Sequence, residues 1–346
     1  MSEGADLKSK KVDVPDSAEA IYEYAYRRGW TDGLPIVPPT EDRVAKMVKE
    51  VGRDPAEMIV RIPPQMGKAT VEKIAINAVM AGCLPGYVPV IIAALEAMCE
   101  PDFNLNGIQA TTNPVAPATI VNGPIRKKLD INCGANCLGQ GWRANATIGR
   151  AIRLLLLNVG GATPGPVDKA VHGQPAKYAM CFGEDEEGSI WEPLHVERGF
   201  KAEESAATVV GMSGTTNILT AGVRNTPEIL MLVGNTLAQM GSNDMFLGGG
   251  QPAVVFAAGH AALFKSEGYS KSDVKRTIYE DAGVPLSEFP KERAEKGVMW
   301  VENGVARPAK RPEDIVLVVA GAPQPYHVAC MPTFGTSRAQ TKPIRV

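Results

Sequence analysis

The sequence has few aromatic residues and no long apolar run. Phe, Trp and Tyr make up 6% of the 346 residues. The longest apolar stretches, residues 88–95 and 154–159, fall well short of the roughly 20 residues that an α-helix needs to span a bilayer. The polar, mixed-charge N-terminus also lacks the apolar segment of a secretory signal peptide. We therefore expect a cytoplasmic protein without a membrane-spanning segment.

An excess of charge and several catalytic motifs are also missing. The chain carries 36 Lys and Arg against 38 Asp and Glu, for a net charge of −2, which argues against a nucleic-acid partner bound by bulk positive charge. No H-E-x-x-H, Walker A or G-x-S-x-G motif is present. Gly139-x-Gly141-x-x-Ala144 approximates the dinucleotide fingerprint, but no apolar strand leads into it and no acidic residue follows about twenty positions later. We expect no nucleotide cofactor.

What the chain does contain is apolar content for a core, at 45%, and many turn residues, with 35 Gly and 27 Pro. Apolar periodicity and capping signals predict helices over 41–51, 70–81, 89–99, 144–158 and 226–240. They also predict the starts of three further helices near 16, 259 and 270. Short apolar runs predict strands at 58–62, 108–112, 118–122, 177–182, 208–211, 253–257 and 315–320. This alternation predicts an α/β fold, with mixed or mostly parallel sheets flanked by helices and Gly/Pro-rich loops at the strand ends.

The domain organisation follows from the same pattern. Residues 1–15 read as a disordered arm, and Asp16 with Glu19 has the spacing of a capping box for the first helix. A Gly/Pro-rich stretch near 160–176 divides an N-terminal α/β half, 16–165, from a C-terminal α/β half, 166–346. Because no long linker separates them, the two halves can equally form one continuous domain. The sequence contains no strict internal repeat.

The most distinctive local feature is a pair of cysteines, Cys133 and Cys137, in a Gly-rich loop that opens into the helix predicted at 144–158. The field of a helix N-terminus lowers a thiol pKa and attracts anions. We therefore take both as catalytic candidates, although two cysteines can also pack as small apolar residues in a tight turn. The candidates for binding an anionic substrate are Arg143, Asn145, Gly139, Gly141 and Asn122.

Other polar residues suggest proton transfer or metal binding. His195 and Glu197 would share one face of a strand and could act as a base with its orienting carboxylate, or form a surface pair. His327 follows a predicted strand, where ligands collect in α/β sheets, although a packing role is also open. Cys133, Cys137 and Cys181 could hold a transition metal. The acidic run 184–187 is typical of a solvated turn.

Six segments together resemble a bacterial protein family: 30–44, 68–83, 103–114, 120–126, 141–154 and 192–200. Members of that family occur beside, or fused to, small proteins with a U/C-Gly-Ser-Cys motif, the UGSC proteins. Those partners are distantly similar to the selenoprotein B components of glycine, sarcosine and betaine reductases. The resemblance implies thiol-linked chemistry. Since this sequence contains no Cys-Gly-Ser-Cys, it also implies a separate thiol or selenol partner protein.

These observations lead to three functional hypotheses. The first is a thiol-dependent enzyme that cleaves or reduces a small anionic organic substrate, with Cys133 or Cys137 as nucleophile and His195 or His327 transferring protons. The second is a metal-dependent hydrolase or lyase with Cys and His ligands. The third is a non-catalytic subunit that binds substrate for a thiol or selenol reductase. In each case we expect a homo-oligomer.

Overall fold

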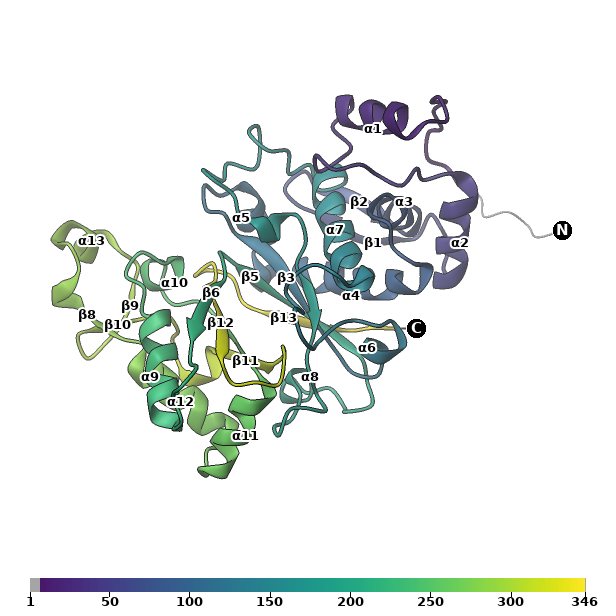
Figure 1. Ribbon diagram of the computed structural model, residues 1–346. Helices are drawn as coiled ribbons and strands as arrows, with labels where there is room; N and C mark the ends of the chain where they lie inside the picture. Colours follow the sequence, from purple (N-terminus) through teal and green to yellow (C-terminus); the bar gives the residue numbers. More distant parts are fainter. Residues whose placement is uncertain (1–6, 346) are drawn as a thin grey trace.

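Two four-stranded sheets form the centre of the structure, a computed structural model that describes residues 7–345 (Figure 1). The first sheet has the strand order β13-β5-β3-β4 and the second the order β11-β7-β12-β6. The strands of the first sheet are β3 (Ala116–Asn122), β4 (Cys181–Gly183), β5 (Ala206–Met212) and β13 (Gln340–Pro343). Those of the second are β6 (Thr216–Leu219), β7 (Ala253–Phe256), β11 (Val316–Val319) and β12 (His327–Met331).

Side-chain alternation along the strands gives each sheet two buried faces. On β7, Ala253 and Val255 belong to one apolar cluster, whereas Val254 and Phe256 belong to another. The cluster that contains Ala253 and Val255 also takes Ala116, Ala118 and Ile120 from β3 of the other sheet. Because successive side chains point to opposite faces, the two sheets pack face to face through this shared cluster, which we call the inter-sheet core.

Helices cover the outer face of each sheet and complete four layers, helix–sheet–sheet–helix (Figure 1). The first sheet is covered by α3 (Val71–Ala81), α4 (Val88–Met98) and α7 (Arg143–Asn158). The second is covered by α9 (Thr226–Leu237), α11 (Ala258–Ser266) and α12 (Lys271–Asp281). The mixture of parallel and antiparallel pairs in sheets flanked by helices confirms the predicted α/β class.

The two sheets have the same pairing pattern. In the first, β3 runs parallel to β4 and antiparallel to β5, which in turn pairs antiparallel with β13. In the second, β7 runs parallel to β11 and antiparallel to β12, which pairs antiparallel with β6. In the chain, β6, the outer strand of the second sheet, follows directly after β5 of the first sheet. Likewise β13, the outer strand of the first sheet, follows directly after β12 of the second sheet. The two sheets therefore exchange their outer strands.

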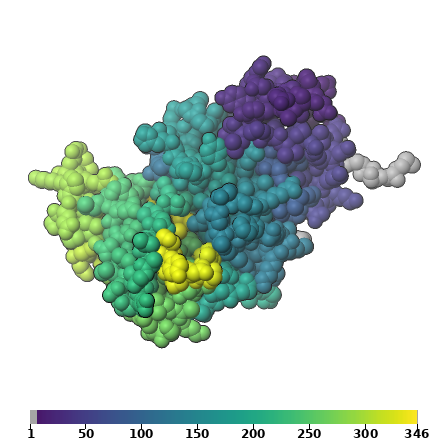
Figure 2. Space-filling model, in the orientation of Figure 1, coloured from purple at the N-terminus to yellow at the C-terminus, as the bar shows by residue number. Residues whose placement is uncertain are grey.

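The exchange happens where the chain crosses itself between the sheets. Ser213 N donates to Pro332 O at 2.8 Å and Phe334 N donates to Gly211 O at 3.0 Å, on either side of a bridge between Met212 and Thr333. Figure 2 shows C-terminal residues, in yellow, seated between the teal and green parts of the chain. The boundary expected at 165/166 falls between β3 and β4, which are neighbouring strands of the first sheet. The first sheet therefore draws strands from both predicted halves, whereas all four strands of the second sheet come from the C-terminal half.

Shorter helices and strands lie around these two sheets. A hairpin of β1 (Met58–Ile62) and β2 (Gly67–Thr70), with α1 (Ala18–Arg27) and α2 (Glu41–Val51), lies at one end, and a small sheet of β8 (Val284–Pro285), β10 (Val305–Arg307) and β9 (Trp300–Glu302) lies at the other (Figure 1). The remaining short helices are α5 (Leu105–Ala110), α6 (Ile125–Lys128), α8 (Leu194–Glu197), α10 (Asn243–Phe246) and α13 (Lys291–Lys296). The 3₁₀ turns are η1 (Pro85–Tyr87), η2 (Pro101–Phe103), η3 (Pro175–Lys177), η4 (Leu286–Glu288) and η5 (Pro312–Asp314).

Three local predictions were wrong. The predicted strand at 108–112 is mostly the helix α5, because the Asn104 side chain accepts a hydrogen bond from Gly107 N at 3.2 Å and caps a helical turn. The cap of α1 is Ser17 and not Asp16. Of the strand predicted at 177–182, only the end forms β4, because Pro175 begins a 3₁₀ turn that reaches Lys177.

The predicted disordered arm, 1–15, is described from residue 7 onward, and its first six residues lie outside the described part. Residues 7–15 form no helix or strand, but they are attached to α3. The Glu72 carboxylate accepts hydrogen bonds from Lys8 N at 3.2 Å and Ser9 N at 2.9 Å, and Leu7 packs against the core. This part of the arm is therefore ordered, because a buried carboxylate binds its backbone.

The lengths of the helices show whether any of them could span a membrane. Within residues 7–345, no single helix is long and apolar enough to cross a membrane. One pair of helices, Val71–Ala81 with Pro85–Met98, reaches that length and composition together, but it is bent by 120°.

Candidate functional site

The carboxyl ends of β4 and β11 meet where the two sheets pack together. Asp185 N, just after β4, donates to Val319 O at the end of β11 over 2.7 Å. Gly321 N, just after β11, donates to Cys133 O at 2.9 Å. Ligands in α/β proteins collect beyond the carboxyl ends of strands. The loop with the two cysteines therefore lies at an edge suited to a site, joined to both sheets.

Asn145, in the first turn of α7, holds this loop in place. Its Oδ1 accepts from Asn132 N at 2.8 Å, while its Nδ2 donates to Asn132 O at 3.0 Å and to Cys137 O at 3.1 Å. The side chain is 5% exposed. Both polar atoms are thus engaged by the loop backbone, so Asn145 acts as a clip for the loop and offers no free atom to a substrate.

Cys133 is half-buried, and its thiol lies beside a guanidinium. Arg126 Nη1 donates to Cys133 Sγ at 3.4 Å. Burial raises the pKa of the Cys133 thiol above its usual value; the positive charge of Arg126 opposes this shift, whereas Asp185 and Glu187 add to it. Because the guanidinium favours the thiolate, Arg126 is the group at this site that makes ionisation of Cys133 easier.

Arg126 is fixed by two carboxylates. It belongs to α6, and its side chain is 3% exposed. Nε donates to Glu186 Oε1 at 3.2 Å, and Nη2 donates to both oxygens of Glu187 at 3.0 and 3.1 Å. Glu186 Oε1 also accepts from Gly123 N at 2.6 Å. The guanidinium therefore has a defined orientation, with Nη1 directed at the thiol.

Cys137 lies deeper than Cys133. Its side chain belongs to the inter-sheet core and is 5% exposed. Burial raises the pKa of its thiol to about 11, and the nearby Cys133 and Asp185 contribute in the same direction, although the N–H groups of Cys137 and Leu138 oppose it. Of the two candidate nucleophiles, only Cys133 combines partial exposure with a cationic partner.

A buried polar cluster adjoins the carboxyl end of β3. Asn122 Nδ2 donates to Glu184 Oε2 at 2.6 Å and to Glu186 Oε1 at 3.1 Å, and Leu194 N donates to Glu184 Oε2 at 2.8 Å. Burial raises the pKa of Glu184, although its hydrogen bonds and Lys271 oppose the shift. The Nδ2 group of Asn122 thus binds the carboxylates of the acidic run, which is not the solvated turn that the sequence suggested.

His195 and Glu197 do not form the predicted base and carboxylate. They lie in the short helix α8 and not in a strand, because Pro193 ends the extended segment before them. His195 is fully buried, and neither of its ring nitrogens has a hydrogen-bond partner in residues 7–345. Glu197 instead forms ion pairs with Lys271, at 2.6 Å, and Lys275. Burial disfavours the charge of Glu197, but the two lysines outweigh it and lower the pKa.

The other predicted anion-binding residues have structural contacts. Arg143 donates through Nε and Nη2 to Gly82 O at 3.0 and 2.9 Å. A Cβ at Gly139 would lie 2.4 Å from the Asn136 side chain, so glycine is needed there for close packing. Gly141 has φ +123°, a conformation that favours glycine. Gly139 and Gly141 therefore shape the cysteine loop, and Arg143 joins the start of α7 to the end of α3.

The predicted metal ligands are not brought together. Cys181 belongs to the core between the first sheet and its helices, whereas Cys137 belongs to the inter-sheet core on the opposite face. No group of three or more His, Cys, Asp or Glu in the described chain is arranged to hold a metal ion. His327 is the first residue of β12, an inner strand of the second sheet, and its Nδ1 lies 3.2 Å from Asn217 Nδ2. Within residues 7–345 no hydrogen bond joins it to a cysteine.

The site residues that the sequence reasoning missed are Arg126, Glu186 and Glu187. Arg126 stands in the segment 120–126, and the two glutamates stand in the acidic run. No local pattern connects them, since Arg126 and Glu186 are sixty positions apart in the chain.

The chain was also compared with known proteins. No family model matches it, and no curated protein is significantly similar to it.

Proposed function

We propose that this protein is a thiol-dependent enzyme acting on a small organic substrate, with Cys133 as its nucleophile and Arg126 as the group that stabilises the thiolate. The observation that carries the proposal is the 3.4 Å contact from Arg126 Nη1 to Cys133 Sγ. The thiolate, and not the thiol, is the reactive form of cysteine, and an adjacent cation increases its population.

The other thiols support this assignment by contrast. Burial raises the pKa of Cys83, Cys99 and Cys330 to about 12, and of Cys137 to about 11. The thiol of Cys181 is shifted upward even further by the same cause. Buried thiols in apolar surroundings are inert. Cys133 is the cysteine in the described chain with a guanidinium donor at its sulfur.

The local charge favours an uncharged substrate over the anion expected from the sequence. Arg126 and Lys127 face Asp185, Glu186 and Glu187 around the thiol, and Arg126 is already paired with two of these carboxylates. An anion entering this environment would meet carboxylates that no free cation balances. We therefore propose a neutral or weakly polar organic substrate at Cys133.

A thiol-alkylation experiment tests the nucleophile. Iodoacetamide labelling followed by peptide mass spectrometry, from pH 7 to 9, should modify Cys133 faster than any other cysteine. Arg126→Lys keeps a positive charge for the carboxylates but removes the donor at the sulfur, so labelling of Cys133 at pH 7 should slow by about tenfold, as expected for one unit of thiol pKa. Lys127→Arg is the matched control and should label like the wild type. Equal labelling of Cys133 and Cys99 would overturn the proposal.

If the reaction is a reduction, two electrons must come from outside the chain, and we propose a thiol or selenol partner protein of the U/C-Gly-Ser-Cys type as their source. The family resemblance supports this partner. The test is to treat the protein, mixed with such a partner whose second motif cysteine is replaced by serine, with one equivalent of the thiol oxidant diamide. Diamide takes up the two electrons and two protons, and Cys133 and the remaining motif cysteine become joined in a mixed disulfide. Cys133→Ser should abolish the trapped complex, while Cys99→Ser should not.

A further inference from the structure

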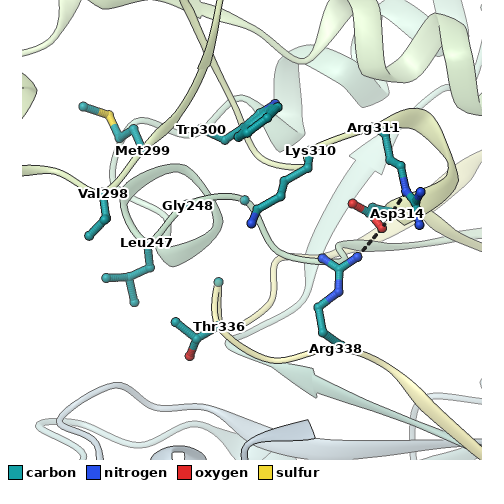
Figure 3. A pocket seen from close by; sticks show the side chains of 12 residues that line it. Leu247, Gly248, Val298, Met299, Trp300, Lys310, Arg311, Asp314, Thr336 and Arg338 are labelled. Atoms are coloured by element: carbon teal, nitrogen blue, oxygen red, sulfur yellow. Dashed lines mark hydrogen bonds and ion pairs between the residues drawn. The ribbon is translucent and has the colours of Figure 1, made fainter. Parts of the chain in front are cut away.

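We infer that a second site, a cavity of about 670 Å³ at the far end of β11, binds a small amphipathic anion: a carboxylate or phosphate group attached to an apolar or aromatic body. Cationic side chains and apolar side chains line different walls of this cavity (Figure 3). The cations are Lys310, Arg311 and Arg338, and the apolar wall consists of Leu247, Val298, Met299 and Trp300.

The cavity is separate from the cysteine site. It lies at the amino end of β11, next to Asp314, whereas Cys133 is bonded to Gly321 beyond the carboxyl end of the same strand. The four residues of β11 span roughly 13 Å at about 3.3 Å per residue. The two sites therefore lie at opposite ends of the second sheet.

The charges of the cavity do not balance. Asp314 is the carboxylate among its lining residues, and it pairs with Arg338 and, at 3.6 Å, with Arg311. Asp314 Oδ1 also accepts from Gln251 Nε2 at 3.2 Å. Three cations against one carboxylate leave two positive charges for a ligand to neutralise. A cavity lined by an excess of one charge concentrates ligands of the opposite charge.

Lys310 is the cation most available to a ligand. It is exposed and takes part in no ion pair within residues 7–345. Its Nζ lies 5.8 Å from the centre of the Trp300 ring, and Figure 3 shows the ammonium close to Gly248. An anion bound at Lys310 would therefore have an aromatic surface directly beside it.

The apolar wall is unusually open. Val298 is 70% exposed and Trp300 is 37% exposed, and both line the same cavity as the three cations. Ligand sites combine apolar and aromatic walls with a few convergent polar groups. The backbone N–H groups of Gly335 and Thr336, also in the lining, have no acceptor in the described chain. These features fit a ligand with an apolar body and one anionic group.

Calorimetric titration with phenyl phosphate, benzoate and the neutral benzamide tests the inference. Both anions should bind, and benzamide should bind at least tenfold more weakly. The tighter of the two anions identifies the preferred anionic group. Inorganic phosphate should bind more weakly than phenyl phosphate, because it cannot use Trp300. Equal binding of benzamide and benzoate, or no binding of either anion, would overturn the inference.

Matched variants locate the ligand. Lys310→Met should weaken phenyl phosphate binding at least tenfold, whereas Lys291→Met, at a 90% exposed side chain on α13, removes the same charge and should leave binding within twofold of the wild type. Equal effects of the two variants would contradict the assignment to this cavity. Cys133→Ser should bind phenyl phosphate as the wild type does, so this inference stands or fails independently of the proposed enzyme activity.

Discussion

The two sheets pair their strands in the same way but differ in the chain that connects their parallel strands. The connection from β3 to β4 in the first sheet contains the cysteine loop and α7, whereas the connection from β7 to β11 in the second contains α11, α12 and the small sheet β8-β10-β9. Each connection supplies central residues of one candidate site: Arg126 and Cys133 in the first, and Trp300 and Lys310 in the second. The comparison teaches that two sheets with the same pairing pattern carry different side-chain clusters, because the connections between their parallel strands differ.

The two candidate sites also differ in how they bury charge. In the first, Arg126 is 3% exposed and pairs with Glu186, which is 14% exposed. In the second, Asp314 is buried, but its partners Arg338 and Arg311 are 31% and 68% exposed. The first arrangement is a closed ion-pair network, and the second leaves its cations accessible. The predictions below test this difference, beginning with the largest effect.

Arg126→Met should lower the free energy of unfolding by about 3–5 kcal/mol, because it removes the buried guanidinium and leaves the largely enclosed carboxylate of Glu186 without its cation. Lys127→Met, at a neighbouring side chain that is 67% exposed, should cost less than about 1 kcal/mol. Urea denaturation measures both values. Equal losses would show that the ion-pair network at the first site is no more closed than a surface ion pair.

Asn145→Ala should lower the free energy of unfolding by about 2–3 kcal/mol, because three hydrogen bonds to the loop backbone are lost. Loosening the loop should also speed the alkylation of Cys137, measured by mass spectrometry. Asn235→Ala in α9 is the control in the second half, since that exposed side chain bonds only its own helix, at Met231 O, and it should cost less than about 0.5 kcal/mol. If Cys137 were labelled at the wild-type rate in Asn145→Ala, the proposed role of Asn145 in holding the loop would be contradicted.

Gly149→Ala and Gly234→Ala should each destabilise by about 1–2 kcal/mol through overpacking. A Cβ at Gly149 in α7 would lie 2.6 Å from Met180 N, and one at Gly234 in α9 would lie 2.5 Å from Asp281 Cβ. Gly241→Ala, with no atom within 4 Å, should be neutral to within about 0.5 kcal/mol. Thermal denaturation compares the three. Similar losses at Gly149 and Gly234 would confirm that both helical layers are equally tight.

Asp244, beside the strand exchange, should make stability depend on pH. Its oxygens accept from Thr333 N and Thr333 Oγ1, both at 2.6 Å, but burial raises its pKa from 3.8 to about 7. The folded state therefore holds the proton more tightly than the unfolded state, and the resulting stabilisation is complete below pH 3.8 and lost as the pH rises through about 7.

Urea denaturation at pH 5 and pH 8 measures this effect. Asp244→Asn should flatten the decrease between the two pH values, whereas Asp42→Asn, on the surface of α2, should preserve it. An identical pH dependence in the wild type and in Asp244→Asn would contradict the assignment to Asp244.

Much of the local structure could be predicted, because the signals lie within a few residues of each other. Gly52 and Gly82 end their helices in the left-handed conformation, as expected of glycine after a helix. Ser270 and Asp273 form the capping box at the start of α12. Where local signals were ambiguous, as at 108–112, the prediction was wrong, because a short apolar run fits a strand and a helix turn equally well.

The candidate site was predictable only in part. The sequence alone indicates that a Gly-rich loop carries Cys133 and Cys137 before a helix, but it does not show which of the two is accessible. It pairs His195 with Glu197, whereas each has other surroundings in the structure. The nearest cation to the thiol is Arg126, which the loop motif does not contain.

By itself, the sequence determined the α/β class, most helix limits and the loop that carries the thiols, because periodicity, capping and turn formation depend on neighbouring residues. Only the tertiary structure decided the exchange of outer strands, the contact between Arg126 and Cys133, and the union of Lys310 and Arg338 in one cavity. These features join residues far apart in the chain, and they depend on how the two sheets pack, which no local pattern records.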